Sequence, residues 1–325
     1  MGDRIELRKL IGFGKATFSI TLPKRWVKEN ALRKGDLILV QEKGPEKLEI
    51  SPKLTEQQEL IKEVTLSVND KTLKELEREL ITAYINDYSI INLIGNLQGK
   101  VGEIRNLLNE LIGLEIMEVS NNKIIAKVFS DVTNTHVSNI IRRISLITKT
   151  MFEELQNLFD GNCDYTSMMD SDREINRQTY FATSILTKAI KSTYFCSAVK
   201  MELTEAAFAL KIIDVQEKIG DQLKHMARQL CDTGILKKTK PKHTKDFAKH
   251  TLQILATYEN AIKAYIGRDR KLANDTIEET REIRNKLDQY IKDSCEMPVP
   301  YVMGNLGVLA SHISDLGNTV YNTEF

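Results

Sequence analysis

The chain has 325 residues, of which 42% are hydrophobic and 28% are charged. Lys and Arg (46) nearly balance Asp and Glu (45), so the net charge of +1 of the whole chain predicts no affinity for nucleic acid. This length accommodates about two or three domains, and the composition indicates a mostly helical protein. The four cysteines lack the spacing of a zinc site or a disulfide framework, which favours a reducing compartment.

The N-terminal sequence lacks the charged and apolar segments of a secretory leader, so we expect a cytoplasmic protein. The longest stretch without Asp, Glu, Lys or Arg covers residues 297–314. It contains two prolines and two glycines, which make it a poor membrane span. We expect a buried terminal helix there instead.

Residues 13–40 place a strand, a basic helix and a second strand in close succession. Alternating apolar side chains predict the first strand at 18–22, and Pro23 then favours a helix start. Residues 34–36 (Lys-Gly-Asp) indicate a turn before a strand that begins at 37–40. A β unit of this size has too little core to stand alone, so we expect it to dimerise.

This N-terminal segment carries a local charge surplus. Residues 1–40 hold 9 Lys or Arg and 4 Asp or Glu, a surplus of +5 (9 − 4), which a dimer would double. A basic two-fold symmetric body is what a duplex-binding protein presents to DNA. By charge alone, a simple solvated face explains the surplus equally well.

The whole pattern over residues 4–52 resembles the swapped-hairpin domain of the AbrB, SpoVT and MazE transcription factors. In that family two chains interleave their hairpins and present basic strand and loop residues to DNA. The resemblance implies a DNA-binding and dimerisation domain over residues 1–54, with double-stranded DNA and a second copy of the chain as partners. The DNA-contacting residues that it implies are Arg8, Lys9, Lys15, Lys24 and Arg25.

A glycine-rich segment at 12–17 does not fit a phosphate-binding loop. The Walker pattern requires glycine where Lys9 stands, and Ser or Thr where Ala16 stands. We therefore expect no nucleotide cofactor, and the glycines indicate a turn.

Residues 60–132 predict an αβ linker domain with the element order βαβαββ. No metal spacing, glycine loop or catalytic pairing of carboxylates with histidine occurs in it, which favours a spacer or a dimerisation element. The expected strands lie at 64–68, 89–94, 114–119 and 123–129, and the expected helices at 73–84 and 101–111.

From residue 136 to the end, strand signals disappear and the pattern predicts an all-α body of two three-helix bundles. The two repeats, 136–234 and 243–325, open with helices of similar length, and DREIN at 172–176 echoes TREIR at 280–284, which indicates an internal duplication. The expected helices are 136–159, 165–191, 197–232, 243–266, 270–293 and 301–323.

Two helices of the first repeat carry oxygen-bearing side chains at one-turn spacing. Glu217 and Asp221 are four residues apart, and so are Asp172 and Asn176. Metal sites in helical bundles are built from such side chains on facing helices. The alternative is a solvated face with local ion pairs, because Lys224 and His225 closely follow Asp221.

The two repeats resemble PhoU, the regulator of phosphate uptake, over about residues 136–325, and Glu217-Lys-Ile-Gly-Asp221 matches its third-helix motif. Combined with an AbrB-like head and an αβ segment, this is similar to phosphate uptake regulators of archaeal type. The resemblance implies a divalent or iron-type metal ion. Its implied ligands are Asp172, Asn176, Glu217 and Asp221, with His225 and Asp315 as weaker candidates.

Several positions depart from the PhoU pattern. Asn176 stands where the family usually has an acid, and Thr280 and Arg284 replace both acids of the second-helix motif in the second repeat. Ser311 also precedes Asp315 in place of an acid. We therefore expect the second metal site to be lost, and we hypothesise that Arg284 supplies a fixed charge in place of the metal.

These features predict a cytoplasmic transcriptional regulator of phosphate homeostasis, with a DNA-binding head and a body that senses or relays phosphate status. An alternative is a PhoU-type adaptor that negatively regulates a phosphate ABC transporter by contact with its ATPase subunit, the head serving only dimerisation. A third interpretation, a metal-dependent hydrolase, needs a general base beside an open metal position, and His225 is the one nearby candidate. We expect no enzyme activity.

Overall fold

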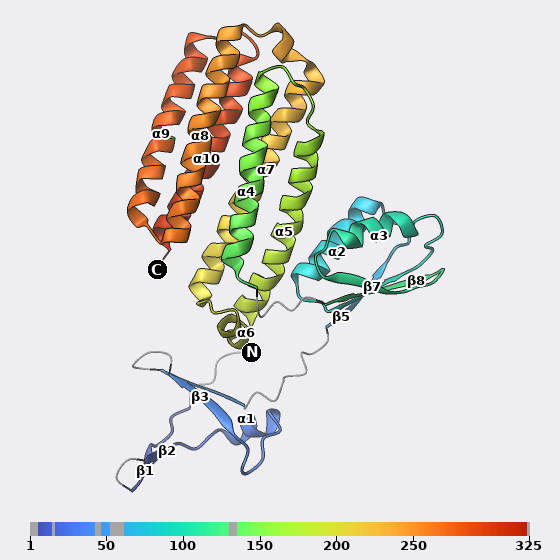
Figure 1. Cartoon of the computed structure of the whole chain (residues 1–325). Helices are drawn as coiled ribbons and strands as arrows, with labels where there is room; N and C mark the ends of the chain where they lie inside the picture. The colour runs from blue at the N-terminus through green and yellow to red at the C-terminus, as the bar shows by residue number, and fades with distance from the viewer. Residues whose placement is uncertain (1–5, 15–16, 43–46, 53–61, 130–134, 324–325) are drawn as a thin grey trace. The chain divides into compact units, whose positions relative to one another are not determined.

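The computed structural model describes residues 6–14, 17–42, 47–52, 62–129 and 135–323 (Figure 1). The chain divides into two compact units, an N-terminal unit, Met1–Ile61, and a C-terminal unit, Lys62–Phe325.

The N-terminal unit consists of two small antiparallel hairpins with a short helix between them. Pro23 stands at the N-cap of that helix, as its fixed φ predicts. The first predicted strand is shorter than expected, and strands β1 and β4 were not predicted. The elements are β1 (Ile11–Phe13), β2 (Thr17–Ser19), α1 (Lys24–Glu29), β3 (Ile38–Glu42) and β4 (Leu48–Pro52). β1 pairs with β2, and β3 pairs with β4.

The N-terminal unit has no core of its own among its described side chains, none of which is buried. Several of its large apolar residues are instead open to solvent, with Leu7 98%, Phe18 67% and Leu37 63% exposed. Successive residues of a strand face opposite sides, yet Leu39 and Val40 of β3 are both exposed. Both faces of this hairpin are therefore uncovered in the single chain.

The C-terminal unit begins with the αβ domain (residues 62–129), and its element order confirms the predicted βαβαββ. The sheet order is β5-β6-β8-β7, with β5 and β6 parallel and the other pairs antiparallel. Helices α2 and α3 cover one face of the sheet (Figure 1). The elements are β5 (Glu63–Ser67), α2 (Leu73–Ile85), β6 (Ile90–Ile94), α3 (Val101–Asn109), β7 (Leu114–Val119) and β8 (Lys123–Val128).

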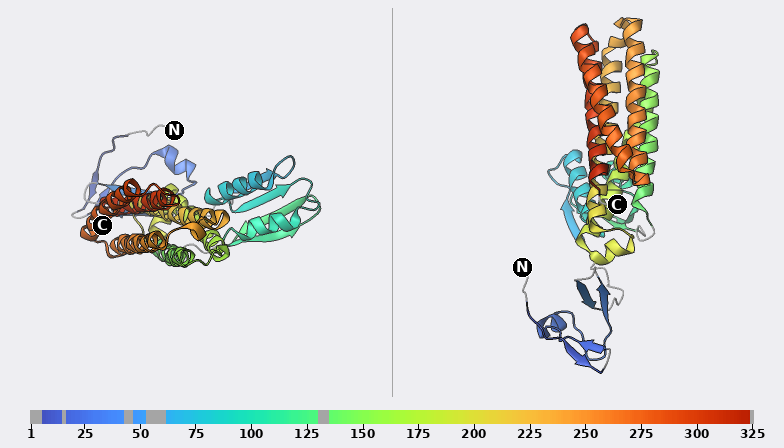
Figure 2. Two further views of the ribbon diagram at one scale, coloured as in Figure 1. Left: turned by 90° about the horizontal axis from the view of Figure 1, so that it is seen from above. Right: turned by 90° about the vertical axis from the view of Figure 1, so that its left-hand side faces the viewer.

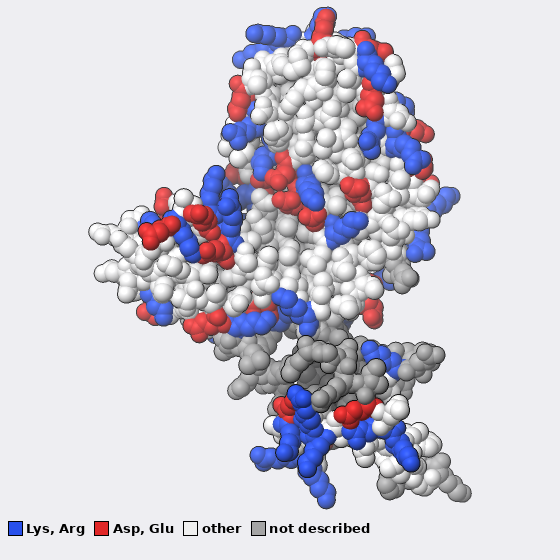
Figure 3. Space-filling model, turned by 180° about the vertical axis from the view of Figure 1, so that it is seen from behind, with Lys and Arg blue, Asp and Glu red and all other residues white. Residues whose placement is uncertain are grey.

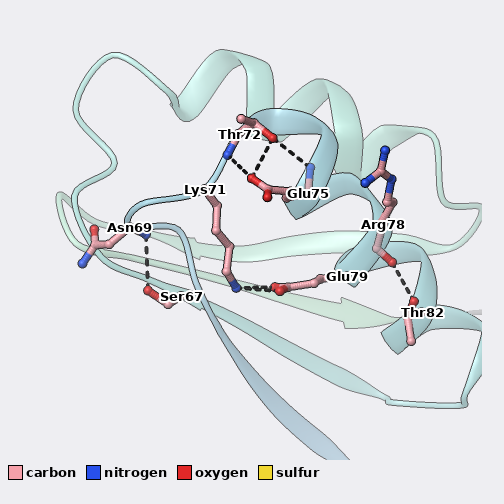
Figure 4. A network of polar contacts seen from close by, with 8 residues as sticks. All are labelled: Ser67, Asn69, Lys71, Thr72, Glu75, Arg78, Glu79 and Thr82. Carbon is pink, nitrogen blue, oxygen red and sulfur yellow. Dashed lines mark hydrogen bonds and ion pairs between the residues drawn. The ribbon is translucent and has the colours of Figure 1, made fainter.

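Local hydrogen bonds fix the start of α2 over the sheet (Figure 4). The hydroxyl of Thr72 accepts a bond from the backbone N–H of Glu75, and the Glu75 carboxylate accepts one from the backbone N–H of Thr72. This reciprocal capping box satisfies two backbone donors that a helix start leaves free. Lys71, just before the helix, also forms an ion pair with Glu79 of α2, and its Nζ lies 2.6 Å from Glu79 Oε2.

The helical body (residues 135–323) follows, and its six long helices lie close to the predicted ranges. The short helix α6 was not predicted, and α7 begins six residues later than expected because Lys200 adopts a left-handed φ of 55° that interrupts the helix. The helices are α4 (Val137–Phe159), α5 (Thr166–Lys191), α6 (Thr193–Ala198), α7 (Leu203–Thr233), η2 (Ile235–Lys238), α8 (Pro241–Gly267), α9 (Arg270–Asp293) and α10 (Val299–Asn322).

The long helices run side by side along a common axis (Figures 1 and 2). Their buried apolar side chains form one continuous core, because α7 packs on α10 and α4 packs on α8. The two predicted sets of three helices therefore share their interior. None of the helices in the described part of the chain is long and apolar enough to cross a membrane.

The αβ domain packs against the body through α5. Tyr180 and Phe181 of this helix contact the core of the αβ domain. Near the end of α5, Lys191 Nζ donates to Asn86 Oδ1 at 3.1 Å, and Lys188 Nζ lies 3.6 Å from Asp87 Oδ1. Helix α5 thus packs both within the helical bundle and against the αβ domain.

Candidate functional site

Helix α1 presents the basic side chains of the N-terminal unit. Lys24 and Arg25 form its first turn and are exposed, as is Lys9. Lys28 lies one turn after Lys24, so the two ammonium groups project from the same side of the helix. Lys15 lies outside the described residues.

Acidic neighbours partly neutralise the two predicted arginines. Arg25 Nε donates to Glu29 Oε1 at 2.6 Å, and Arg8 pairs with Glu6. Among the described residues, Lys24 and Lys28 make no ion pair. The lysines are therefore the more available contacts for a phosphate backbone.

Three further cations belong to this basic surface and were missing from the predicted contact residues. Lys28, Arg33 and Lys34 are all exposed. Figure 3 shows Lys and Arg side chains gathered on the visible face of the N-terminal unit. The backbone N–H of Arg33 donates to Asp36 Oδ2 at 2.6 Å, which fixes the turn after the helix. The signal that could have found them is their position on the same helix and turn as Lys24.

The predicted carboxylate site lies between α5 and α7, which pack closely at Gly220. A Cβ atom at this glycine would lie 2.9 Å from Ile175 Cδ1, so only a residue without a side chain fits without a shift. This approach brings Asp172 on α5 near Asp221 on α7. The sequence spacing predicted this juxtaposition.

A lysine occupies the space between the two carboxylates. Lys224 Nζ lies 2.8 Å from Asp172 Oδ2 and 2.6 Å from Asp221 Oδ1. Burial raises the pKa of Asp172, and Lys224 opposes this shift. Burial lowers the pKa of Lys224, but its hydrogen bonds to both carboxylates outweigh burial and raise that pKa above the ordinary value. The chain thus supplies its own cation to this cluster.

The other two predicted ligands lie beside this ion-pair cluster. Asn176 directs its amide Nδ2 toward Asp172 Oδ2, at 3.4 Å. Glu217 is half-buried, and burial together with the negative charge of Asp221 raises its pKa to about 7. A carboxyl group with a raised pKa keeps its proton more readily, and an amide N–H cannot ligate a cation, so these two groups as arranged are weaker ligands for a hard cation than two ionised carboxylates.

The weaker candidates lie at exposed positions. His225 and Asp315 are both open to solvent. In the described ranges, no group of three or more His, Cys, Asp or Glu side chains is placed to hold a metal ion. With Lys224 between the carboxylates, the residues as arranged do not fit a metal, and the predicted metal ion stays a prediction. The ion pair between Lys224 of α7 and Asp172 of α5 can hold these two helices together.

In the second repeat, the positions that depart from the PhoU pattern have ordinary surroundings. The Thr280 hydroxyl is buried and donates to the backbone carbonyl of Ile277 at 2.7 Å. Arg284 is exposed. The expected loss of a second metal site and the fixed-charge role of Arg284 stay predictions.

Comparison with known families identifies part of the N-terminal unit. Residues 14–58 match the family described as antidote-toxin recognition MazE, bacterial antitoxin. The match supports the predicted swapped-hairpin character of this unit and covers a minor part of the chain. Neither a curated protein nor a solved structure matches the chain significantly.

Proposed function

We propose that this chain is a homodimeric regulator whose N-terminal unit binds duplex DNA and whose helical body relays phosphate status. The observation that carries the proposal is the exposed basic surface of α1 and its following turn, on a unit that matches the MazE family. Domains of the MazE and AbrB type commonly bind DNA and dimerise. The N-terminal unit is therefore a regulatory head that binds duplex DNA and a second copy of the chain.

Dimerisation follows from the lack of a core in the head. Apolar residues such as Leu37 and Phe18 remain largely exposed in the single chain, and apolar surface of this extent is normally covered by a partner. A second copy of the same hairpins is the partner that the family match supports. Two heads would place two sets of basic side chains on one symmetric body.

DNA binding by this surface would be governed by contacts with phosphates. Lysines such as Lys24 and Lys28 release counterions when they neutralise phosphates, so log K should fall with log salt by about 0.9 for each contacted phosphate. Base-specific contacts would add to this term, and the operator sequence depends on them.

The role in phosphate homeostasis rests on the resemblance of the helical body to PhoU. The motif from Glu217 to Asp221 and the six-helix organisation support it. The relay requires no catalysis by the chain.

The test is fluorescence anisotropy of labelled DNA from upstream of phosphate-transport genes, titrated with the full chain across a salt series. The double variant Lys24→Gln/Lys28→Gln should weaken binding and flatten the salt slope by about 0.9 for each phosphate contact removed. Its matched control is Lys245→Gln/Lys249→Gln, which removes two exposed lysines at the same spacing on α8. Equal binding by both double variants would contradict the proposed DNA surface.

A second candidate is the adaptor that regulates a phosphate ABC transporter by contact with its ATPase subunit. The name of the matching family describes recognition of a protein, so the match is also compatible with a head that does not bind DNA. This candidate predicts that the full chain has no measurable affinity for DNA at low salt. Such a result would leave the head as a dimerisation or protein-docking element.

A further inference from the structure

A cavity of about 270 Å³ opens at one end of the helical body, where four segments of the chain meet. These are the start of α4, the link between α6 and α7, the end of α8 and the residue that follows α10. The cavity is lined by none of the residues of the ion-pair cluster, which are Asp172, Asp221 and Lys224. Its polar lining includes His136, Arg142, Lys200, Glu205, Tyr265 and Arg268.

Positive charge dominates this lining. Arg142, Lys200 and Arg268 come from three different segments, and Glu205 is the one acidic residue among the described lining side chains. Arg268 Nη2 lies 2.9 Å from Glu205 Oε1, so that pair is neutral overall. Arg142 and Lys200 remain as an excess of two positive charges.

The backbone holds two of these cations in uncommon conformations. Lys200 has φ 55° and Arg268 has φ 54°, both in the left-handed region that non-glycine residues rarely adopt. Each of them follows the end of a helix, α6 and α8 respectively, and lines the same cavity.

Arg142 differs from its sequence neighbour Arg143 in its ion pairing. Arg143 Nη2 donates to Glu174 Oε1 on α5 at 2.8 Å. Arg142 lines the cavity and makes no ion pair with any residue that the structure describes. The cavity also includes Val137 and Ser138 at the start of α4, where no side chain caps the helix. Free backbone N–H groups there add partial positive charge.

We propose that this cavity binds a small oxyanion, either free phosphate or the phosphate group of a small metabolite. A planar guanidinium such as that of Arg142 can donate two parallel hydrogen bonds to phosphate oxygens. The cavity of about 270 Å³ is large enough for a phosphate with its nearest waters or for a small organic phosphate. A role of this cavity in phosphate sensing rests on the proposed function. Binding of the anion to the cavity does not depend on whether the head binds DNA.

Equilibrium dialysis of the full chain against radiolabelled orthophosphate tests the proposal, with glycerol phosphate and adenosine monophosphate as competitors. We expect one site per chain. The Arg142→Gln variant should weaken binding about tenfold or more, because it removes charge-assisted hydrogen bonds. The matched control, Arg143→Gln, removes the same charge from the adjacent residue and should leave the affinity within about twofold.

A second variant is expected to strengthen binding. Glu205 competes with an incoming anion for Arg268, so Glu205→Gln should increase the affinity for orthophosphate several-fold. Glu205 also accepts a bond from the backbone N–H of Glu202 at the start of α7. Glutamine can serve at this capping position, so the helix start should persist.

The outcomes separate this proposal from the DNA-binding head. Stronger competition by the organic phosphates than by unlabelled orthophosphate would identify a metabolite as the ligand, and the reverse would identify free phosphate. Absence of binding by all three anions, or equal binding by Arg142→Gln and Arg143→Gln, would overturn the site. Anisotropy with DNA measures the head independently, so either proposal can fail while the other stands.

Discussion

The two units of this protein differ in how far they bury their apolar side chains. The N-terminal unit buries none of its described side chains, whereas the C-terminal unit has one core in the αβ domain and another in the helical body. A domain of a few dozen residues encloses too little volume to bury its apolar side chains, and a bundle of long helices does not have this limitation. This difference is the reason for proposing a dimer through the head, whereas the αβ domain and the helical body each have a core within one chain.

The largest expected effect is therefore the loss of the dimer on a change in the head. Leu39→Asp places a charge on the apolar strand β3, where a partner strand would cover it, and should raise the dimer dissociation constant at least 100-fold, about 2.7 kcal/mol. Sedimentation equilibrium measures this constant. The control is Leu146→Asp, a residue of α4 that is 66% exposed and should leave the mass unchanged.

A dimer that survives Leu39→Asp would show that the head is covered by something other than a second head. In that case the exposed apolar residues of the head would not be the surface through which the two chains associate.

The body should respond differently from the head to the loss of an apolar side chain. Leu223 of α7 is fully buried, so Leu223→Ala should lower the free energy of unfolding by about 2–5 kcal/mol. Because its contacts are within one chain, this loss should not depend on protein concentration. Urea unfolding at two concentrations measures both, and Leu39→Ala in the head should show a concentration-dependent loss.

The smallest effect is expected at the ion-pair cluster of the body. Lys224→Met leaves the largely buried Asp172 without its cation and should cost about 1–3 kcal/mol in urea unfolding. The control, Lys218→Met, removes an exposed partner of Asp214 and should change stability by about 0.5 kcal/mol or less.

The same two variants address the predicted metal ion. If the ammonium group of Lys224 competes with a metal for Asp172 and Asp221, then Lys224→Met should take up Mn²⁺ or Fe²⁺ more tightly than the unaltered chain. Titration calorimetry measures the affinity, and Lys218→Met should leave it unchanged. Equal metal affinity in all three proteins would exclude the competition.

Periodicity predicted the regular elements well because each depends on its own residues. The apolar stripe of α7 appears as buried side chains such as Ile212, Ile219 and Leu223. The strand β1 was missed because three residues carry too little periodic signal. The strand β4 was missed although Leu48 and Ile50 alternate with Glu49 and Ser51. Helix α6 was missed because six residues carry too little periodic signal.

Local spacing and composition were enough to predict the element order of the αβ domain, the six long helices, the basic surplus of the head and the spacing of the acids on α5 and α7. Only the tertiary structure placed Lys224 between Asp172 and Asp221, and only it joined Arg142, Lys200 and Arg268 around one cavity. The physical reason is that ion pairs and cavities depend on distances between segments far apart in the chain. Periodicity reports the faces of single elements and contains no such distances.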